Sequence, residues 1–385
     1  MTATLESVLG TDGLARFAEK GVVRHGLPPR AYTSDDFLAL ENERLFPNAW
    51  TFVEFAHDLA KPGDVVPVEV AGQPVLLVRD TKTEIRAFHN VCRHRGTILV
   101  EESKNVGRFL TCPYHTWEYG LDGALRSTPH FGGPHNAVPE GFDPARYGLK
   151  PVRCAVWHDW IFVNLSGDAP DFDAYVAPLA KQLDGVGVSE AKPVATIEFG
   201  EVKANWKFLM ENFIEPYHVQ FVHATTTEQP LRDHRTLIDG ICLGSAVNIS
   251  RPKAGGGRDT LAVDSRYLTL FPNFVLGYYV PDQLGVHLNV PLTAGRTRQR
   301  RVIYHMGEEA PAADVVAGLR TLWGNVHRED HAIVERLQRG RASEVAADGG
   351  LLSPHWEDSV RRFQELVIEA LHPAARTDKE IEPVG

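Results

Sequence analysis

The sequence predicts an α+β protein in which a small strand-rich domain precedes a larger domain of strands and helices. A chain of 385 residues is too long for one small core, so two domains are expected. Short runs of alternating apolar and polar residues begin near Trp50, and two segments with helical periodicity close the chain. Strands followed by a strand region capped with helices are typical of α+β folds.

The N-terminal segment, residues 1–44, is expected to be partly helical and to pack on the larger domain. Residues 33–46, TSDDFLALENERLF, begin with a Thr or Ser that can cap a helix, and acidic and helically spaced apolar residues follow. The opening stretch has no apolar core of the kind that a signal peptide requires.

Residues 45–165 are predicted to form a small antiparallel β domain. Residues 64–80, DVVPVEVAGQPVLLVRD, contain two strand-like runs around an Ala-Gly-Gln-Pro turn, and residues 84–92 contain a third run. Residues 107–127 alternate in the same way around a Leu-Asp-Gly turn. The run AVWHDWIFVNLS at 155–166 is expected to be one further apolar strand.

Residues 166–385 are predicted to form the larger domain. A helix is expected within 169–185, and the chain changes from strand-like to helical near Ala204. The segment PKAGGGRD at 252–259 is expected to be a flexible loop. The later expected elements are strands within 267–281, 285–293 and 298–306, and helices near 311–339 and 354–371.

The composition excludes several classes of protein. The hydrophobic fraction of 43% and the charged fraction of 23% are ordinary for a globular protein. A net charge of −10 without a long basic run argues against binding to nucleic acid. The longest apolar runs, such as WIFVNL, are too short to span a bilayer, so no membrane association is expected. Four cysteines without a secretion signal predict a reduced, cytoplasmic protein.

Two short segments each place a cysteine beside a histidine. The pattern is Cys92-x-His94, then 17 residues, then Cys112-x-x-His115. Two cysteines and two histidines could bind one zinc ion, but zinc fingers usually pair Cys with Cys and His with His along the chain. One residue of each type per loop suits a cluster whose two irons differ, with thiolates on one iron and imidazoles on the other. Four such residues in this pattern are hard to explain as ordinary core residues.

With the stretches VCRHRG at 91–96 and TCPYHTWEYG at 111–120, the chain resembles the Rieske [2Fe–2S] domain over roughly residues 45–165. The resemblance implies a [2Fe–2S] cluster with two protein ligands on each iron. Cys92 and Cys112 would bind one iron, and His94 and His115 would bind the other.

A second candidate metal site lies in NWKFLMENFIEPYHVQFVH at 205–223. His218 and His223 are five residues apart, or about 140° around an ideal helix, so they would not share a helix face. Pro216 interrupts the regular hydrogen-bond ladder of a helix. A distorted or ending helix could therefore bring both imidazoles to one metal.

The residues around these histidines closely resemble the mononuclear iron motif of Rieske non-heme iron oxygenase α subunits. The resemblance implies a facial triad of His218, His223 and a late carboxylate, which leaves open positions for O₂ and substrate. Asp330 is the favoured third ligand, and its neighbour Glu329 is the rival. Asn212 is expected to lie near the iron. The family's Glu-x-x-Gln-x-Gly stretch follows the acid and is formed here by Glu335, Gln338 and Gly340.

Glu215 stands three residues before His218, where many members of this family have an aspartate. Glutamate also occurs in members that resemble choline, glycine betaine and carnitine monooxygenases. The resemblance implies that Glu215 links an iron-ligand histidine to a cluster histidine across a subunit boundary, as a bridge in electron transfer. Such a boundary implies a head-to-tail ring, usually a homotrimer.

The resemblance implies a terminal oxygenase with a helix-grip-like catalytic domain and a mononuclear non-heme Fe(II). Electrons from NAD(P)H would come from a separate flavin and iron–sulfur reductase, directly or through a ferredoxin. The chain itself has no convincing nucleotide-binding signature, because the GGG at 255–257 lacks the strand–GxGxxG–helix context.

The resemblance favours monooxygenation of a small organic substrate, by hydroxylation or by N- or O-demethylation, over cis-dihydroxylation of an aromatic ring. A quaternary ammonium compound is one candidate substrate. A Rieske electron carrier without oxygenase activity and a zinc-stabilised binding protein are the alternatives. Four aromatic residues could line a cage for such a cation or could pack in the core, namely Phe271, Phe274, Tyr278 and Tyr279.

Overall fold

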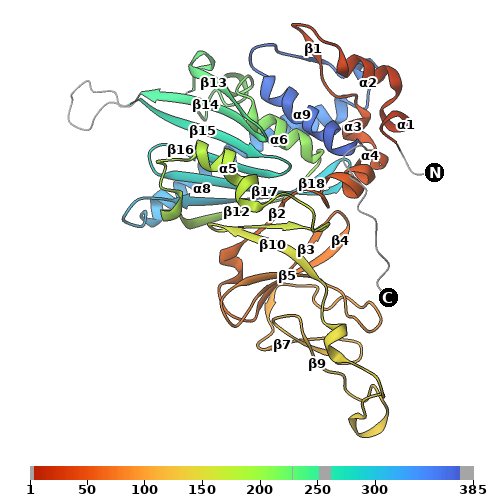
Figure 1. The fold of residues 1–385 in the computed structure, drawn as a ribbon. Helices are drawn as coiled ribbons and strands as arrows, with labels where there is room; N and C mark the ends of the chain where they lie inside the picture. Colours follow the sequence, from red (N-terminus) through yellow and green to blue (C-terminus); the bar gives the residue numbers. More distant parts are fainter. Residues whose placement is uncertain (1–3, 228, 251–261, 373–385) are drawn as a thin grey trace. The chain divides into compact units, whose positions relative to one another are not determined.

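The computed structural model describes residues 4–227, 229–250 and 262–372 (Figure 1). The chain divides into two compact units, which we call the small unit (Phe46–Tyr175) and the large unit (Met1–Leu45 with Val176–Gly385). The glycine-rich segment 252–259, which the sequence predicts to be a flexible loop, lies outside the described residues.

The small unit consists of two antiparallel sheets. The first sheet has seven strands in the order β2-β11-β10-β5-β4-β3-β6, and the second has three in the order β7-β8-β9. The strands are β2 (Thr51–Phe55), β3 (Asp64–Val70), β4 (Gln73–Arg79), β5 (Ile85–His89), β6 (Lys104–Asn105), β7 (Phe109–Thr111), β8 (Glu118–Gly120), β9 (Leu125–Ser127), β10 (Pro151–Trp157) and β11 (Trp160–Asn164).

One element of the small unit was predicted wrongly. Residues 155–166 are not a single strand, because they contain the end of β10, a turn at His158 and Asp159, and the whole of β11. The chain reverses at His158, which has a positive φ of 56°, and at Asp159, whose carboxylate accepts a hydrogen bond from the His57 amide at 2.8 Å. Apolar residues on both sides of this polar pair concealed the turn, because β11 is buried along its whole length.

The large unit is built on one antiparallel sheet of seven strands in the order β12-β18-β17-β16-β15-β14-β13. Three helices pack on this sheet: α6 against β14, β15 and β17, α9 against β13 and β14, and α8 against β12 (Figure 1). The strands are β12 (Lys192–Val202), β13 (His234–Asp239), β14 (Cys242–Ser250), β15 (Ala262–Leu270), β16 (Phe274–Tyr279), β17 (Gln283–Thr293) and β18 (Arg296–His305). The longer helices are α5 (Phe172–Gln182), α6 (Trp206–Ile214), α8 (Ala313–Gly340) and α9 (Asp358–Leu371).

The N-terminal segment contains several short helices and belongs to the large unit. Its elements are α1 (Leu5–Leu9), α2 (Thr11–Ala18), α3 (Arg30–Thr33), α4 (Asp35–Leu40) and a π-helical turn (Glu41–Leu45). The strand β1 (Arg24–His25) pairs with β19 (Leu351–Leu352), so this segment also meets the C-terminal part of the chain.

A buried ion pair joins the N-terminal segment to α6. Lys207 Nζ lies 2.7 Å from Glu41 Oε1, and neither side chain is exposed to solvent. Trp206 Nε1 donates a second hydrogen bond to Glu41 Oε2 at 3.0 Å. Burial raises the pKa of Glu41 and lowers that of Lys207, and each partner opposes the effect on the other. Removal of one partner would leave an uncompensated buried charge, which typically costs about 3–5 kcal/mol.

A second buried network connects α3, α6 and α9. Tyr32 donates its hydroxyl proton to Glu211 Oε1 at 2.7 Å, and Gln364 Nε2 donates to the same oxygen at 3.2 Å and to the Tyr32 hydroxyl at 3.0 Å. Burial raises the pKa of Glu211 to about 7. The carboxyl group is therefore protonated in the folded protein at pH values where an exposed glutamate is charged.

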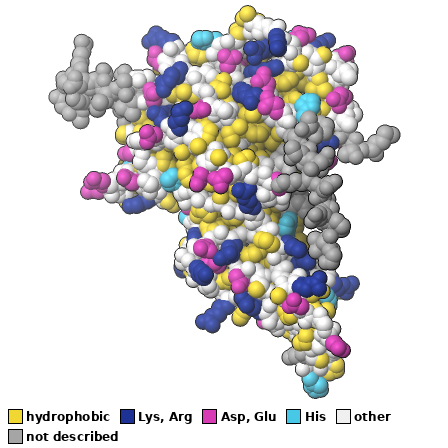
Figure 2. Space-filling view, in the orientation of Figure 1, with side chains coloured by type: hydrophobic (Ala, Val, Ile, Leu, Met, Phe, Trp, Pro, Cys, Tyr) yellow, Lys and Arg dark blue, Asp and Glu magenta, His cyan; other side chains and the backbone are white. Residues whose placement is uncertain are grey.

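Within the part of the chain that the structure describes, no helix combines the length and apolarity needed to cross a membrane. Basic and acidic side chains are interspersed on the face that Figure 2 shows.

The raised pKa of Glu211 predicts a pH-dependent stability. The unfolded chain ionises Glu211 near 4.5 and the folded chain near 7, so the free energy of unfolding falls as pH rises between these values. The loss amounts to about 3 kcal/mol. In Glu211→Gln this fall should be absent, as urea denaturation between pH 5 and 8 can measure. Glu344→Gln, at an exposed glutamate, is the control. An equal pH dependence in Glu211→Gln and the wild type would contradict the assignment.

Candidate metal centres

His218 and His223 lie at the two ends of a single helical turn. The helix α6 ends at Ile214, because Pro216 cannot donate the next backbone hydrogen bond and Glu215 is extended (φ −108°, ψ 140°). The short helix α7 (Val219–Val222) follows, with His218 at its N-cap and His223 at its C-cap. The centroids of the two imidazole rings are 5.3 Å apart. The helix therefore ends at the proline, and this interruption brings the histidines together.

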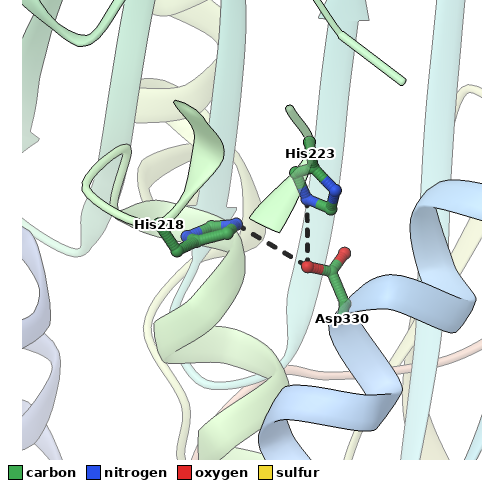
Figure 3. A group of neighbouring side chains, drawn as sticks. All are labelled: His218, His223 and Asp330. Atoms are coloured by element: carbon green, nitrogen blue, oxygen red, sulfur yellow. Dashed lines mark ion pairs between the residues drawn. The ribbon is translucent and has the colours of Figure 1, made fainter. Parts of the chain in front are cut away.

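Asp330 of α8 completes a group of three possible ligands. Its carboxylate points into the space between the two imidazoles (Figure 3). Asp330 Oδ1 lies 3.6 Å from His218 Nε2 and 3.1 Å from His223 Nε2. Across the described ranges, this is the one set of three or more His, Cys, Asp or Glu residues whose ligand atoms all lie within 4.8 Å of one another.

Two further carboxylates orient the imidazoles. Glu215 Oε1 lies 2.6 Å from His218 Nδ1, and Glu329 Oε2 lies 2.7 Å from His223 Nδ1. With both Nδ1 protons donated to these acids, the Nε2 lone pairs face Asp330. Asp330 Oδ1 itself is buried without a hydrogen-bond donor. Three acceptors that converge without a donor need a cation between them, and two imidazoles with one carboxylate suit Fe(II).

The same arrangement distinguishes Asp330 from Glu329. Glu329 accepts hydrogen bonds from His223 and from Thr226 Oγ1, the latter at 2.7 Å, so it acts on the side of the ring that faces away from Asp330. Asp330 alone faces both Nε2 atoms. The geometry favours Asp330 as the third ligand and gives Glu329 an orienting role that the sequence did not suggest.

The surrounding acids also change the proton affinity of both histidines. Burial lowers the pKa of His218, but Glu215 and then Asp330 outweigh that effect and the net pKa is raised. For His223 the effects of Asp330 and Glu329 likewise exceed that of burial, and its pKa is also raised. A proton and a metal ion would thus compete for the same two lone pairs.

The register of α8 against α6 is fixed by the residues of the Glu-x-x-Gln stretch. Glu335 Oε1 accepts a hydrogen bond from the Lys203 amide at 3.1 Å, and Gln338 Oε1 accepts one from the Asn205 amide at 2.8 Å. These bonds lie one to two helical turns beyond Asp330. They hold the acid opposite the histidines that follow α6.

A cavity opens beside the three ligands. Asn212, predicted to lie near the iron, lines this cavity. Of the four aromatic residues considered for a cage, Tyr279 lines it, whereas Phe271, Phe274 and Tyr278 are buried elsewhere. The lining residues are Asn212, Phe213, Glu215, His218, Val219, His223, Thr227, Gln229, His234, Ser245, Tyr267, Tyr279, His287, Arg301, Trp323, Val326, His327 and Asp330.

Several polar residues of this cavity were not predicted from the sequence. Thr227 Oγ1, both ring nitrogens of His234, and Nε and Nη2 of Arg301 are buried without a hydrogen-bond partner. Arg301 could have been found, because Thr297, Gln299 and Arg301 are the buried alternate positions of β18. An arginine at an inward-facing strand position is unusual and points to a polar site.

The two cysteine–histidine loops of the small unit have the same backbone turn. The Gly96 amide donates to the Cys92 carbonyl, and the Thr116 amide donates to the Cys112 carbonyl, both at 3.0 Å. Both turn residues have positive φ, at 79° for Gly96 and 54° for Thr116. Both cysteines are only 2% exposed, so the thiols lie inside and the partly buried histidines lie nearer the surface.

The side chains of these loops fit a two-iron cluster better than one zinc ion. The imidazoles of His94 and His115 are 4.7 Å apart between centroids, and both Nδ1 atoms are buried without a partner. Tyr119 Oη lies 3.3 Å from Cys92 Sγ, and Trp117 stacks on His94 at 4.8 Å. A single tetrahedral ion would bring three or more ligand atoms within 4.8 Å, and among the described residues only the triad does so.

Both parts of the chain match known families. The family described as the Rieske [2Fe-2S] domain matches residues 49–140, and the ring hydroxylating alpha subunit (catalytic domain) matches residues 172–372. These two families carry a Rieske [2Fe–2S] cluster and a mononuclear non-heme iron, and the donor sets described above fit both groups.

Individual relatives resemble different lengths of the chain. The carnitine monooxygenase oxygenase subunit of Acinetobacter baumannii is 30% identical over 366 residues, which cover 89% of this chain and 94% of the relative. The glycine betaine monooxygenase oxygenase subunit of Chromohalobacter salexigens is 36% identical over 199 residues, or 52% of this chain and 43% of the relative. The chain thus spans less than half the length of that relative in the match.

Solved structures share the complete fold. A quaternary ammonium Rieske monooxygenase in complex with an inhibitor has a TM-score of 0.77 at 24% identity, with 97% of this chain and 100% of the other covered. Naphthalene 1,2-dioxygenase from Rhodococcus sp. has a TM-score of 0.78 at 19% identity, with 96% and 99% covered. At these identities the likeness concerns the fold alone. With a Rieske domain followed by the catalytic domain, the chain belongs to the α subunits of the Rieske non-heme iron oxygenases.

Proposed function

We propose that this protein is a terminal oxygenase component that monooxygenates a small organic substrate, by hydroxylation or by oxidative N- or O-demethylation. The observation that carries the proposal is the convergence of His218, His223 and Asp330 on one point in the wall of a cavity. The names of the carnitine and glycine betaine monooxygenase oxygenase subunits support monooxygenation. Dihydroxylation of an aromatic ring is the alternative, and electron transfer without oxygenation is a further one.

A quaternary ammonium compound is the substrate class that we favour. Relatives that cover most of this chain are a carnitine monooxygenase and the chloroplastic choline monooxygenase of Spinacia oleracea, the latter 28% identical over 86% of this chain. The cavity also contains two aromatic rings, Phe213 and Tyr267, whose faces can attract a cation.

The protein's own residues prepare the site for this chemistry. When bound, the [2Fe–2S] cluster supplies electrons one at a time and the mononuclear iron supplies the capacity to activate O₂. His218 and His223 would present their Nε2 atoms to the metal, and Asp330 would add one oxygen. Glu215 and Glu329 keep both rings in the required tautomer and orientation.

Glu215 has a further proposed role that depends on a second chain. Its carboxylate already accepts a hydrogen bond from His218. We propose a head-to-tail homotrimer in which Glu215 also meets a cluster histidine, His94 or His115, of the neighbouring subunit. A separate flavin and iron–sulfur reductase would deliver the electrons, with or without a ferredoxin. The cytoplasmic location inferred from the sequence stays a prediction.

Replacement of one iron ligand should separate the two metal centres. His218→Ala should lower the iron content from about three to about two per chain, because the [2Fe–2S] cluster keeps its own ligands. Elemental analysis measures the loss, and visible absorption should show an intact Rieske cluster. His372→Ala, at an exposed histidine, should retain all the iron. Retention of the third iron in His218→Ala would contradict the proposed ligand.

The reaction type can be decided with a surrogate reductase. With NAD(P)H and a trimethylammonium substrate such as glycine betaine or carnitine, we expect O₂ uptake coupled to formaldehyde release, because hydroxylation of an N-methyl group yields an unstable hemiaminal. His218→Ala should abolish both signals. Formation of a cis-diol from an aromatic substrate would instead support the dioxygenase alternative. Reduction of the cluster without oxidation of any substrate would support the electron carrier.

The bridging role of Glu215 predicts a loss of turnover without a loss of iron. Glu215→Gln keeps the size of the side chain but removes the charge and one acceptor oxygen, so we expect turnover to fall about tenfold or more. Iron content, trimer mass by sedimentation and direct reduction of the cluster by dithionite should be unchanged. Glu329→Gln is the matched control, because it alters the other orienting acid, which has no proposed role across the boundary. Equal losses in both variants would argue against the bridge.

A further inference from the structure

Arg301 is a buried charged residue that the iron site does not use. It lies on β18, is 1% exposed, and lines the same cavity as His218, His223 and Asp330. Burial lowers the pKa of Arg301, and Tyr279 and Asp330 oppose this effect in part. An arginine remains protonated even so, because its ordinary pKa is far above neutrality. The cavity therefore has a fixed positive charge in its wall.

The hydrogen-bond partners of this guanidinium are neutral. Arg301 Nη1 lies 3.0 Å from His287 Nε2 and 3.2 Å from His327 Nε2. Burial lowers the pKa of both histidines well below the usual value, so each accepts the bond as a neutral imidazole. Within the described ranges, no carboxylate forms an ion pair with Arg301. The charge lacks the anionic partner that buried arginines usually have.

The unpaired part of Arg301 has the shape that a carboxylate requires. Nε and Nη2 are both buried without a hydrogen-bond partner. Their N–H bonds lie along one edge of the guanidinium, and this fork matches the two oxygens of a carboxylate. The flat faces are used differently: the guanidinium carbon lies 3.8 Å from the ring centroid of Trp323 and 5.3 Å from that of Tyr279. The aromatic rings thus hold the plane while one edge lacks a partner.

Two glycines make room for this arrangement. Gly285 of β17 lies beside Arg301, and a Cβ added there would come within 2.2 Å of Arg301 Nη2. Gly277 of β16 is its direct cross-strand partner, and a Cβ there would come within 2.2 Å of the Tyr279 hydroxyl. The adjacent missing side chains let the guanidinium and the phenol lie against the sheet. Both neighbouring strands have a glycine at this point, so the fold provides the space that the Arg301 and Tyr279 side chains fill.

We propose that Arg301 binds a carboxylate group of the substrate through Nε and Nη2. The inference deepens the proposed function and rests on it, because it takes the cavity beside the three ligands to be the substrate site. A substrate with a positive charge and no carboxylate would be repelled by the guanidinium of Arg301 and would leave its N–H groups unpaired. A small carboxylate would satisfy Arg301, and a zwitterion could in addition place its ammonium group against Phe213 and Tyr267. With Arg301 in its wall, the cavity favours carboxylate-bearing compounds over cationic alcohols.

The test compares matched carboxylates and alcohols as ligands of the iron-loaded, cluster-containing protein. Three pairs serve as probes: glycine betaine with choline, 3,3-dimethylbutyrate with 3,3-dimethyl-1-butanol, and benzoate with benzyl alcohol. Anaerobic calorimetry measures each affinity without turnover. We expect the wild type to bind the carboxylate of at least one pair about tenfold or more tightly than its alcohol. No preference in any of the three pairs would overturn the inference.

Substitution at Arg301 assigns the preference to this residue. Arg301→Met should remove the preference for the carboxylate and leave the affinity for the alcohol within about twofold of the wild type. Arg298→Met changes an exposed arginine on the opposite face of the same strand and should change neither affinity. Equal weakening of carboxylate and alcohol in Arg301→Met would indicate a structural role and overturn the inference.

A second variant covers the case in which Arg301→Met does not fold. Arg301→Lys keeps the charge but loses the fork, so it should retain only part of the carboxylate preference. Full retention of the preference in Arg301→Lys, with the cluster spectrum intact, would contradict a bidentate contact.

The inference and the proposed function can fail separately. If no compound is oxidised but carboxylates bind through Arg301, the proposed reaction is wrong and the binding site stands. If substrates are oxidised but their affinity depends neither on a carboxylate nor on Arg301, the inference is wrong and the reaction stands.

Discussion

The position of helix α6 is the constraint on which the catalytic unit depends. Its first turn is held by the buried Glu41–Lys207 ion pair, and Asn205 donates its side-chain N–H groups to the Tyr32 and Ala294 carbonyls at 3.2 and 2.7 Å. One turn later, Glu211 accepts a hydrogen bond from the Tyr32 hydroxyl, which ties α6 to the N-terminal segment a second time. A shift of the helix by one residue would leave buried charges and amides without their partners, which is energetically costly. The segment that follows therefore starts from a fixed point.

The fixed position of α6 matters because His218 and His223 lie in the irregular segment that follows it and not in a regular helix. Pro216 ends α6, and the short turn α7 separates His218 from His223. Asp330 comes from a helix more than 100 residues later, and the Gln338–Asn205 bond sets its register against α6. The three ligands thus meet because one buried helix is tied to the N-terminal segment on one side and to α8 on the other.

Patterns that are local in sequence could be recognised in advance. The spacing of Cys92, His94, Cys112 and His115 follows from two tight loops, and the break at Pro216 follows from the chemistry of proline. Long-range relations could not be recognised in the same way. The orienting role of Glu329 depends on which side of His223 it meets, and the alternation of β18 marks Arg301 as inward-facing but does not show that it shares a cavity with the iron ligands. The hairpin at 155–166 was missed because a fully buried strand has no polar alternation to mark its end.

The cavity is lined by two kinds of polar atom without a hydrogen-bond partner. One wall has acceptors without a donor, at Asp330 Oδ1 and the two imidazoles, and another has donors without an acceptor, at the edge of Arg301. Buried polar groups are rarely left unpaired, so such atoms indicate what a site is built to receive. The glycines at 277 and 285 control the position of two lining residues from outside the cavity. A single added methyl group on either strand would displace Tyr279 or Arg301 without touching a ligand of the iron. Substitutions at these two positions would therefore reshape the cavity without placing a new side chain beside the iron ligands, which makes the two codons targets for engineering.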